Sequence, residues 1–143
     1  IVSTGTPFCV VLLKDKDTLQ KAKINSHHFN EYFQKNQKEE KDLMEPFLTT
    51  IGGITSNGDI FSRLLMCQFG NQEDPFTGSA TGCMAAYLWR HGVIDSPKFV
   101  AEQGHWLGRP GSAQVEVLGL ENNISGVNVA GYGYVLMSGS LSL

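Results

Sequence analysis

The chain has 143 residues, 41% of them hydrophobic and 17% charged, with a formal net charge of -3. This length and composition predict one globular domain with a single core. The negative charge argues against a nucleic-acid partner, because nucleic acids are bound by clustered basic residues. The longest apolar run, residues 8–13, is too short to cross a bilayer, and the start lacks a signal-peptide pattern, so no membrane role is expected.

The chain contains three cysteines, which lie inside apolar runs and form no CxxC pair. We therefore expect Cys9, Cys67 and Cys83 to be buried free thiols in a reducing cytoplasm. The alternative role, a nucleophile, lacks a neighbouring His or Lys in the sequence. The chain also begins with Ile1 rather than Met, which suggests a fragment or a processed piece.

The first third of the chain predicts one strand and two short helices. Residues 6–13 follow a Gly-Thr-Pro sequence and are rich in β-branched residues, which favours a strand buried on both faces. From Asp17 the apolar residues recur at helical spacing, with a break near Asn25 and Ser26 where a second helix can be capped. Residues 34–42 carry mixed charge and no apolar residue, which indicates a solvated loop or an exposed helix end.

The middle of the chain predicts a hairpin and a central helix. Two strands, residues 47–55 and 59–68, are joined by Ser56-Asn57-Gly58 and should pair antiparallel. A polar loop over residues 69–77 leads to a helix over residues 79–91 that is apolar nearly all round and ends before a glycine. Such a helix is typical of one enclosed by a sheet.

The last third alternates apolar and polar residues between glycine turns, which predicts a β-meander. The expected strands are residues 99–103, 113–117, 127–129 and 134–137. The whole chain thus predicts an α+β fold, a single lobe over residues 1–143 in which a mostly antiparallel, barrel-like sheet wraps one central helix.

The segment QEDPFTGSATG, residues 72–82, places two carboxylates and a Gly-Ser pair directly before this helix. A helix N-terminus exposes unpaired N–H groups and partial positive charge, which suit a substrate carboxylate or a developing enolate. Gly78 permits close backbone approach, and Ser79 can donate or accept a hydrogen bond. Asp74 can bind an amine or a hydroxyl or hold a catalytic proton.

A purely structural interpretation of the same segment stays open. Thr77 or Ser79 could simply cap the helix, while Glu73 and Asp74 complement its dipole. The segment is neither a P-loop, since no GK[ST] follows, nor a GxSxG elbow, since Ser79 follows Gly78 immediately.

A second candidate is the segment EQGHWLGR, residues 102–109, between two predicted strands. Loops that combine glycines with such polar residues often line pockets. The alternative is a plain connecting loop with an exposed imidazole on His105. The other three histidines lack metal-ligand spacing, so we predict no metal site. The polar and aromatic candidates of this loop are Gln103, His105, Trp106 and Arg109.

Four segments together resemble PhzF-like (phenazine biosynthesis-like) proteins of the diaminopimelate-epimerase fold. They are Ser3-Thr4-Gly5, EDPFTGSATG, EQGHWLGRPG and VNVAGYGYVLMSGSLSL, in matching order and spacing. The most specific of these is EDP-x-TGSA. The resemblance covers essentially the whole chain as the C-terminal half of such a protein.

This resemblance implies two pseudo-symmetric lobes, each a barrel-like sheet around a central helix, with the active site in the cleft between them. It implies an isomerase that moves a proton between carbons of a small-molecule substrate without a metal or an organic cofactor. The expected partners are the N-terminal lobe of the same protein and a second copy in a homodimer.

The resemblance also assigns roles to individual residues. It implies that Asp74 and Ser79 are catalytic, with Asp74 the substrate-binding aspartate. Thr77 and Gly78 belong with Ser79 to an anion-binding turn. Gln103 and Gly104 are expected to bind substrate.

Two features limit what the resemblance implies. Related diaminopimelate epimerases use a cysteine at the start of each central helix, and Thr77 stands at that position here, which disfavours a two-thiol racemase. The main acid/base group is expected in the N-terminal lobe, outside this sequence. Two alternatives stay open: a non-catalytic binding or interaction protein of the same fold, and a hydrolase that uses Ser79, for which no base partner is evident.

Overall fold

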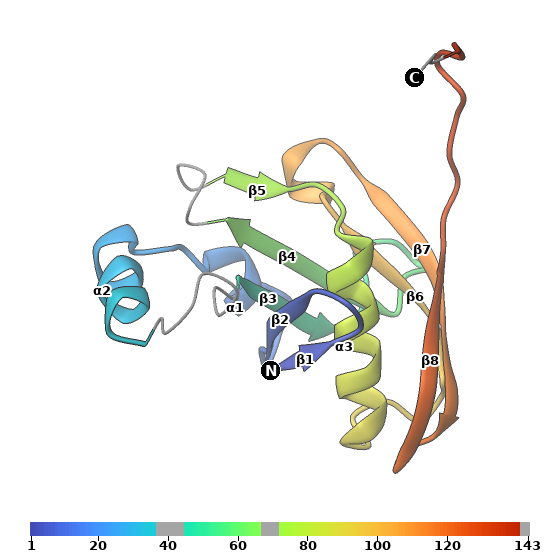
Figure 1. Cartoon of the computed structure of the whole chain (residues 1–143), viewed down its shortest axis with the longest axis horizontal. Helices are drawn as coiled ribbons and strands as arrows, with labels where there is room; N and C mark the ends of the chain where they lie inside the picture. The colour runs from blue at the N-terminus through green and yellow to red at the C-terminus, as the bar shows by residue number, and fades with distance from the viewer. Residues whose placement is uncertain (37–44, 67–71, 141–143) are drawn as a thin grey trace.

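The computed structural model describes residues 1–36, 45–66 and 72–140, which form a curled sheet around one helix, α3 (Figure 1). The order of the sheet is β1-β2-β3-β4-β6-β7-β8, and β5 pairs with β4 beside this path. The strands are β1 (Val2–Ser3), β2 (Pro7–Leu12), β3 (Pro46–Ile51), β4 (Ile60–Met66), β5 (Gln72–Asp74), β6 (Lys98–Gln103), β7 (Gly111–Leu120) and β8 (Asn123–Ala130). The helices are α1 (Lys16–Lys21), α2 (Ser26–Asn36), α3 (Gly78–Arg90) and the 3₁₀ helix η3 (His105–Leu107).

The pairing confirms the predicted mostly antiparallel α+β fold and adds two parallel contacts. β1–β2, β3–β4, β4–β5, β6–β7 and β7–β8 pair antiparallel. β2–β3 and β4–β6 pair parallel. The parallel pair of β4 and β6 requires a crossover connection, and α3 lies within this connection. Strands that precede α3 in the sequence and strands that follow it therefore both cover the helix.

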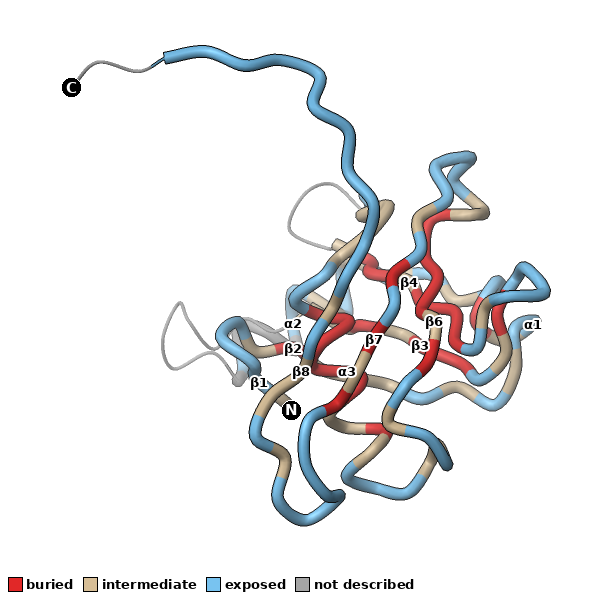
Figure 2. The backbone as a smooth tube through the Cα atoms, turned by 90° about the vertical axis from the view of Figure 1, so that its right-hand side faces the viewer, coloured by how far each residue is buried: buried red, intermediate tan, exposed pale blue. Residues whose placement is uncertain are grey.

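Helix α3 fills the concave side of the sheet and confirms the predicted central helix within one residue at each end. Met84 and Leu88 are fully buried against Phe47 and Leu64 of the central strands. Figure 2 shows that the buried residues concentrate where α3 meets β3, β4, β6 and β7. The core thus consists of one layer of sheet and one helix. No helix in the described ranges is long and apolar enough to cross a membrane.

The N-terminal elements agree with the predictions in type but differ in burial. Both short helices form, and Asn25 Oδ1 accepts the backbone N–H of His28 at 3.1 Å, as expected for a capping residue. Strand β2 was expected to be buried on both faces, but only Phe8 is buried. The reason is that β2 lies next to the two-residue strand β1 at the end of the sheet.

The three predicted buried thiols have different outcomes. Cys83 is fully buried in the core, whereas Cys9 is half-buried on β2, so the prediction of burial is wrong for Cys9. Both are free thiols. Cys67 and most of the predicted solvated stretch, residues 37–42, lie outside the described residues.

The predicted hairpin is confirmed as antiparallel, with a longer connection than the Ser56-Asn57-Gly58 turn alone. The ladder ends at the pair Ile51 and Ile60, and backbone bonds from Gly52 N to Asp59 O and from Gly53 N to Gly58 O close the loop at 2.7 and 3.1 Å. The buried Glu102 of β6 reaches this loop from the side. Its carboxylate accepts the N–H groups of residues 54 and 55 at 2.6 and 3.1 Å and also binds the Thr55 hydroxyl.

Two predicted segments have the wrong secondary structure. Residues 72–74, expected as part of a loop, form β5, because β4 offers a free edge to them. Residues 134–137, expected as a strand, are exposed and have no regular structure. In the β7–β8 register, the residue opposite position 134 would be Pro110, which has no N–H to donate, so the ladder has no partner there.

The Glu102 contact predicts a pH-dependent stability. Burial alone would raise the pKa of Glu102, but the hydrogen bonds from Thr55 and Ile54 and the nearby His105 outweigh it, and the net pKa is lowered. A lowered pKa means that the stabilisation is present above the unfolded-state value and is lost as the pH falls through the folded-state value. Glu102→Gln should lower the unfolding free energy by about 2 kcal/mol at pH 7, because the three donors lose their charged acceptor.

Urea unfolding of the wild type and of Glu102→Gln at pH 7 and at successively lower pH checks this. The difference in unfolding free energy between the two proteins should become smaller below about pH 4.5, where the Glu102 carboxyl of the wild type takes up its proton. Glu116→Gln, which changes an exposed ion pair with Lys98, is the matched control and should have little effect. If the difference in unfolding free energy stayed constant with pH, the charge of the Glu102 carboxylate would not be what stabilises the loop between β3 and β4.

Candidate functional site at the start of helix α3

The C-terminal ends of β5 and β6 meet alongside β4, next to the residue that begins α3. β3 occupies one edge of β4, and β6 and β5 pair one after the other along its opposite edge, so that Gln103 lies opposite Ser62 and Asp74 lies opposite Leu64. Gln103 and Asp74 therefore lie beside the middle of β4, on the two sides of Arg63 in the register, and α3 begins shortly after Asp74 (Figure 1). The two sequence segments that were predicted separately form one structural unit.

The side chain of Gln103 fixes the turn between β5 and α3. It is 1% exposed, and its Nε2 donates to the Asp74 backbone carbonyl at 2.7 Å and to Thr77 Oγ1 at 3.3 Å. Its Oε1 accepts the N–H of Thr77 at 3.1 Å. Because the amide is used on both sides, Gln103 positions the turn; the predicted contact of Gln103 with substrate stays a prediction.

The carboxylate of Asp74 is oriented by Thr77. Thr77 Oγ1 donates to Asp74 Oδ2 at 2.5 Å, and this bond is supported from the other side by the Gln103 amide. The other oxygen, Oδ1, makes no hydrogen bond to the described residues, and Asp74 is half-buried. A fixed carboxylate with one open oxygen can bind a donor group of a ligand.

The first turn of α3 is open to solvent. Thr77 is the N-cap residue, but its side chain makes no capping bond because it turns to Asp74, so the interpretation of Thr77 as a side-chain cap is wrong. Ser79 lies inside the helix and does not cap it either. Gly78 and Ser79 are exposed, which leaves their N–H groups and the Ser79 hydroxyl free to meet ligand oxygens.

Glu73, the other carboxylate of this segment, has a different role from the one considered. Arg63 binds it with two parallel bonds, Nε to Oε1 at 3.0 Å and Nη2 to Oε2 at 2.8 Å. Both side chains are mostly buried, at 13% and 12% exposure. The Glu73 charge is thus compensated by Arg63 on the face of the sheet opposite Asp74, and it does not complement the α3 dipole.

Arg63 also links this ion pair to the rest of the outer face. Its Nη1 donates to the carbonyls of Leu19 at 2.7 Å and Ala22 at 3.1 Å, which lie at the end of α1. Its guanidinium carbon lies 5.7 Å from the centre of the Trp106 ring. One arginine therefore joins α1, β4, β5 and the loop after β6.

Gly104 holds the loop after β6 in place. It has φ +80°, which favours glycine, and its carbonyl accepts the N–H groups of Leu107 and Arg109 at 3.0 and 3.1 Å. A Cβ at this position would overlap the carbonyl oxygens of Pro75 and Arg109. Gly104 lets the loop pack directly on the segment that follows Asp74; its predicted contact with substrate stays a prediction.

His105 is not the exposed imidazole that was considered. Its side chain is 14% exposed, and its ring packs edge-on against Phe61, with centroids 5.6 Å apart. Its Nε2 lies 3.9 Å from Glu102 Oε1. Trp106 contacts the same Phe61 ring at 4.6 Å, so His105 and Trp106 cover the outer face of β4 rather than the side that bears α3.

Glu45 is a residue that the sequence interpretation missed. It directly precedes β3, and its backbone carbonyl accepts the N–H of Cys9 at 3.2 Å. Burial raises the pKa of the Glu45 carboxyl, and the negative charge of Asp74 raises it further. The sequence held no signal for this pair, because the two residues approach only through the pairing of β3, β4 and β5.

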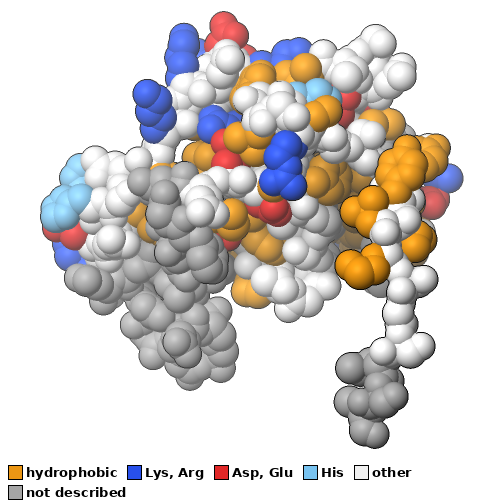
Figure 3. Space-filling view, turned by 90° about the horizontal axis from the view of Figure 1, so that it is seen from above, with side chains coloured by type: hydrophobic (Ala, Val, Ile, Leu, Met, Phe, Trp, Pro, Cys, Tyr) orange, Lys and Arg blue, Asp and Glu red, His pale blue; other side chains and the backbone are white. Residues whose placement is uncertain are grey.

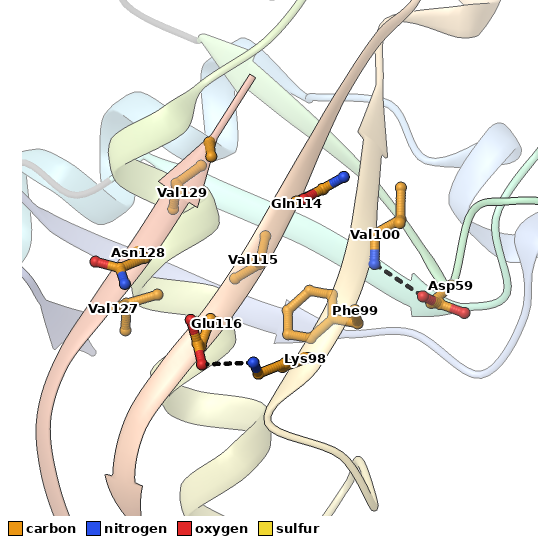
Figure 4. Close-up of a pocket in the computed structure, with 11 residues that line it drawn as sticks. Asp59, Lys98, Phe99, Val100, Gln114, Val115, Glu116, Val127, Asn128 and Val129 are labelled. Carbon is orange, nitrogen blue, oxygen red and sulfur yellow. Dashed lines mark hydrogen bonds and ion pairs between the residues drawn. The ribbon is translucent and has the colours of Figure 1, made fainter. Parts of the chain in front are cut away.

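A separate hollow of about 820 Å³ lies over β6, β7 and β8 (Figure 4). An ion pair between Lys98 and Glu116, 2.9 Å long, crosses it, and Asp59 Oδ2 accepts the Val100 N–H at 2.8 Å. None of the predicted site residues lines it. Among the described residues, no three His, Cys, Asp or Glu side chains are grouped so that they could hold a metal ion.

Comparison with known proteins agrees with this architecture. The chain is 30% identical over 116 residues to the uncharacterized isomerase YfhB of Bacillus subtilis, covering 80% of this chain and 38% of that protein. It is 34% identical over 83 residues to the trans-2,3-dihydro-3-hydroxyanthranilate isomerase of Pseudomonas chlororaphis, covering 57% and 30%. The matched regions thus cover well under half the length of these relatives.

The fold also matches a solved structure. The crystal structure of the PhzF-family phenazine biosynthesis protein of Bacillus anthracis superposes with a TM-score of 0.70 at 26% identity, over 90% of this chain and 43% of that one. The model of the PhzC-PhzF family, described as phenazine biosynthesis-like protein, matches residues 1–139. With this match along nearly its whole length, the chain belongs to the phenazine biosynthesis-like (PhzC-PhzF) family.

Proposed function

We propose that this chain is one lobe of a cofactor-independent isomerase that moves a proton between two carbons of a small metabolite. The observation that carries the proposal is the oriented Asp74 carboxylate beside the open first turn of α3. The relatives named as isomerases support the reaction class. The main acid/base group would come from a second lobe, as the relatives' greater length suggests.

In the proposed mechanism, the chain binds and stabilises rather than abstracts the proton. A substrate carboxylate, or the enolate oxygen that forms when the proton leaves, would accept the N–H groups and the Ser79 hydroxyl at the start of α3. Asp74 would bind an amine or hydroxyl through its open oxygen. Thr77 and Gln103 would hold that carboxylate in one orientation, which reduces reorganisation during the reaction.

The substrate class follows from these groups. We propose a small unsaturated compound that carries a carboxylate together with a hydrogen-bond donor. The substrate named for the Pseudomonas chlororaphis relative, a dihydro-hydroxyanthranilate, carries a carboxylate, an amino group and a hydroxyl and is the first compound to try. A hydrolase that uses Ser79 is less well supported, because Ser79 has no hydrogen-bonded base among the described residues.

Deuterium exchange tests the proposal. The complete protein, with the lobe that precedes this chain in its relatives, is incubated in D₂O with trans-2,3-dihydro-3-hydroxyanthranilate and related unsaturated carboxylates, and NMR follows deuterium at carbon. The complete protein should catalyse exchange, with or without EDTA, and this chain alone should not. Tight binding without exchange would instead indicate the non-catalytic binding protein.

A further inference from the structure

Arg109 is the one arginine of this chain that no protein group binds within the described residues. The chain has three arginines. Arg63 forms the ion pair with Glu73, and Nη1 of Arg90 donates to a backbone carbonyl at 3.2 Å. The side chain of Arg109 is exposed and makes no hydrogen bond or ion pair with the described residues. Such a guanidinium can bind a ligand carboxylate with two parallel hydrogen bonds.

The backbone of Arg109 packs against the turn between β5 and α3. Its N–H donates to the Gly104 carbonyl at 3.1 Å, and its own carbonyl oxygen and that of Pro75 both lie where a Cβ of Gly104 would be. Two residues after Arg109, Gly111 lies so close to the Phe76 ring that a Cβ there would stand 2.6 Å from a ring carbon. These contacts on both sides hold Arg109 next to the residues that lead into α3.

The alternation of β7 places Arg109 on the side of the sheet that bears α3. Val115 and Val117 of β7 belong to the core around α3. Because alternate residues of a strand share a face, this row continues backwards through Gly111 to position 109. The contact of Gly111 with Phe76, just before α3, agrees with this face. Figure 3 looks onto this end of the lobe, where basic, acidic and hydrophobic side chains lie next to one another in the middle of the view.

We propose that Arg109 binds the carboxylate of the substrate and thereby selects anionic ligands. This inference rests on the proposed function and adds to it the side chain that recognises the charge of the substrate. The negative charge of Asp74 disfavours an anionic ligand nearby, and a guanidinium on the same side of the sheet offsets that repulsion. The two side chains together suit a compound that carries a carboxylate and a hydrogen-bond donor at separate positions.

The position of Arg109 also divides the work within the site. With the substrate carboxylate on Arg109, the N–H groups at the start of α3 are left for the enolate oxygen that forms during proton transfer. The half-buried Phe76 ring, fixed against Gly111, offers a flat apolar surface beside them. The substrate class is therefore a planar, unsaturated carboxylate.

Ligand binding to the complete protein tests the proposal without any need for turnover. Anthranilate carries an amino group and a carboxylate on a planar ring, and 2-aminobenzamide has a neutral amide in place of the carboxylate. In calorimetric titrations, Arg109→Gln should weaken anthranilate binding by about 10- to 100-fold, the usual effect of losing hydrogen bonds to a charged group. The affinity for 2-aminobenzamide should change by less than about 2-fold. Arg109→Lys should give an intermediate loss for anthranilate, because the ammonium keeps the charge but not the planar fork.

Arg90→Gln is the matched control, because Arg90 lies in the last turn of α3 and binds the Glu121 carbonyl. It should leave both affinities near those of the wild type. Equal weakening of both compounds by Arg109→Gln would overturn the proposal, and so would a lowered melting temperature with unchanged affinities, since Arg109 would then pair with the other lobe. A wild type that does not prefer anthranilate over 2-aminobenzamide, or binds neither, would also overturn it. Selective anthranilate binding that depends on Arg109, without deuterium exchange at carbon, would contradict the isomerase and leave the role of Arg109 standing.

Discussion

Asp74→Asn in the complete protein is expected to lower turnover about 100-fold or more while it changes the unfolding free energy by less than about 1 kcal/mol. Asparagine keeps the shape of the side chain and an oxygen that can accept from Thr77, so the turn before α3 should persist. What it removes is the negative charge at the open oxygen. The measurement is kcat with the substrate found by deuterium exchange, together with urea unfolding of both proteins.

Glu73→Gln is the matched control, since it removes the charge of the neighbouring carboxylate on the opposite face. It breaks a buried, two-bond contact with Arg63, so we expect a loss of about 2 kcal/mol of stability. The folded enzyme should keep most of its turnover, because Glu73 does not face the start of α3. Unchanged turnover in Asp74→Asn, or an equal loss in both variants, would contradict the assignment of Asp74.

Gly104→Ala is expected to cost about 3 kcal/mol or more of unfolding free energy in the complete protein. The positive φ of +80° is unfavourable for alanine, and the added methyl group would overlap two backbone carbonyl oxygens, of Pro75 and Arg109. Backbone cannot move aside as a flexible side chain can. For a domain of this size the melting temperature should fall by about 6–12 °C, which calorimetry would measure.

Gly108→Ala separates the effect of the positive φ from the effect of steric overlap with the backbone. Gly108 ends the same 3₁₀ helix with φ +67°, but a Cβ there would meet no atom within 4 Å. Gly108→Ala should therefore lower the unfolding free energy by only about 1 kcal/mol, which is the effect of the unfavourable backbone conformation alone. Equal effects at Gly104 and Gly108 would mean that the close packing on Pro75 is not a main support of the loop. A loss of substrate affinity without a loss of stability in Gly104→Ala would instead favour the predicted binding role.

Helix α3 could be predicted from the sequence because its apolar residues recur at one spacing over four turns and a glycine follows its end. The β3–β4 hairpin carried an equally local signal in Asn57-Gly58. The strand β5 could not be found in this way, since three residues with two carboxylates form a strand only because β4 offers them an edge. Predicted residues 134–137 had the right pattern for a strand, but a strand also needs a partner.

Within the candidate site, the sequence indicated Asp74 and the start of α3 because carboxylates and a Gly-Ser pair stood before a helix. The sequence could not show that the Gln103 amide forms hydrogen bonds with Asp74 and Thr77, since Gln103 lies almost thirty positions from them along the chain. The same holds for Glu45, which approaches Asp74 only through the sheet register. The local sequence pattern predicted the start of α3, whereas the pairing of distant strands determines which side chains surround it.

The two parallel strand pairs affect how this lobe can fold. β2 meets β3, and β4 meets β6, through residues roughly 40 positions apart, so each contact requires the closure of a long loop before any hydrogen bond forms. The β7–β8 hairpin and α3 need no such closure and can form early. During synthesis, the first three residues of β4 must therefore wait with one edge unpaired until β6 has emerged, and in that interval this edge is open to aggregation.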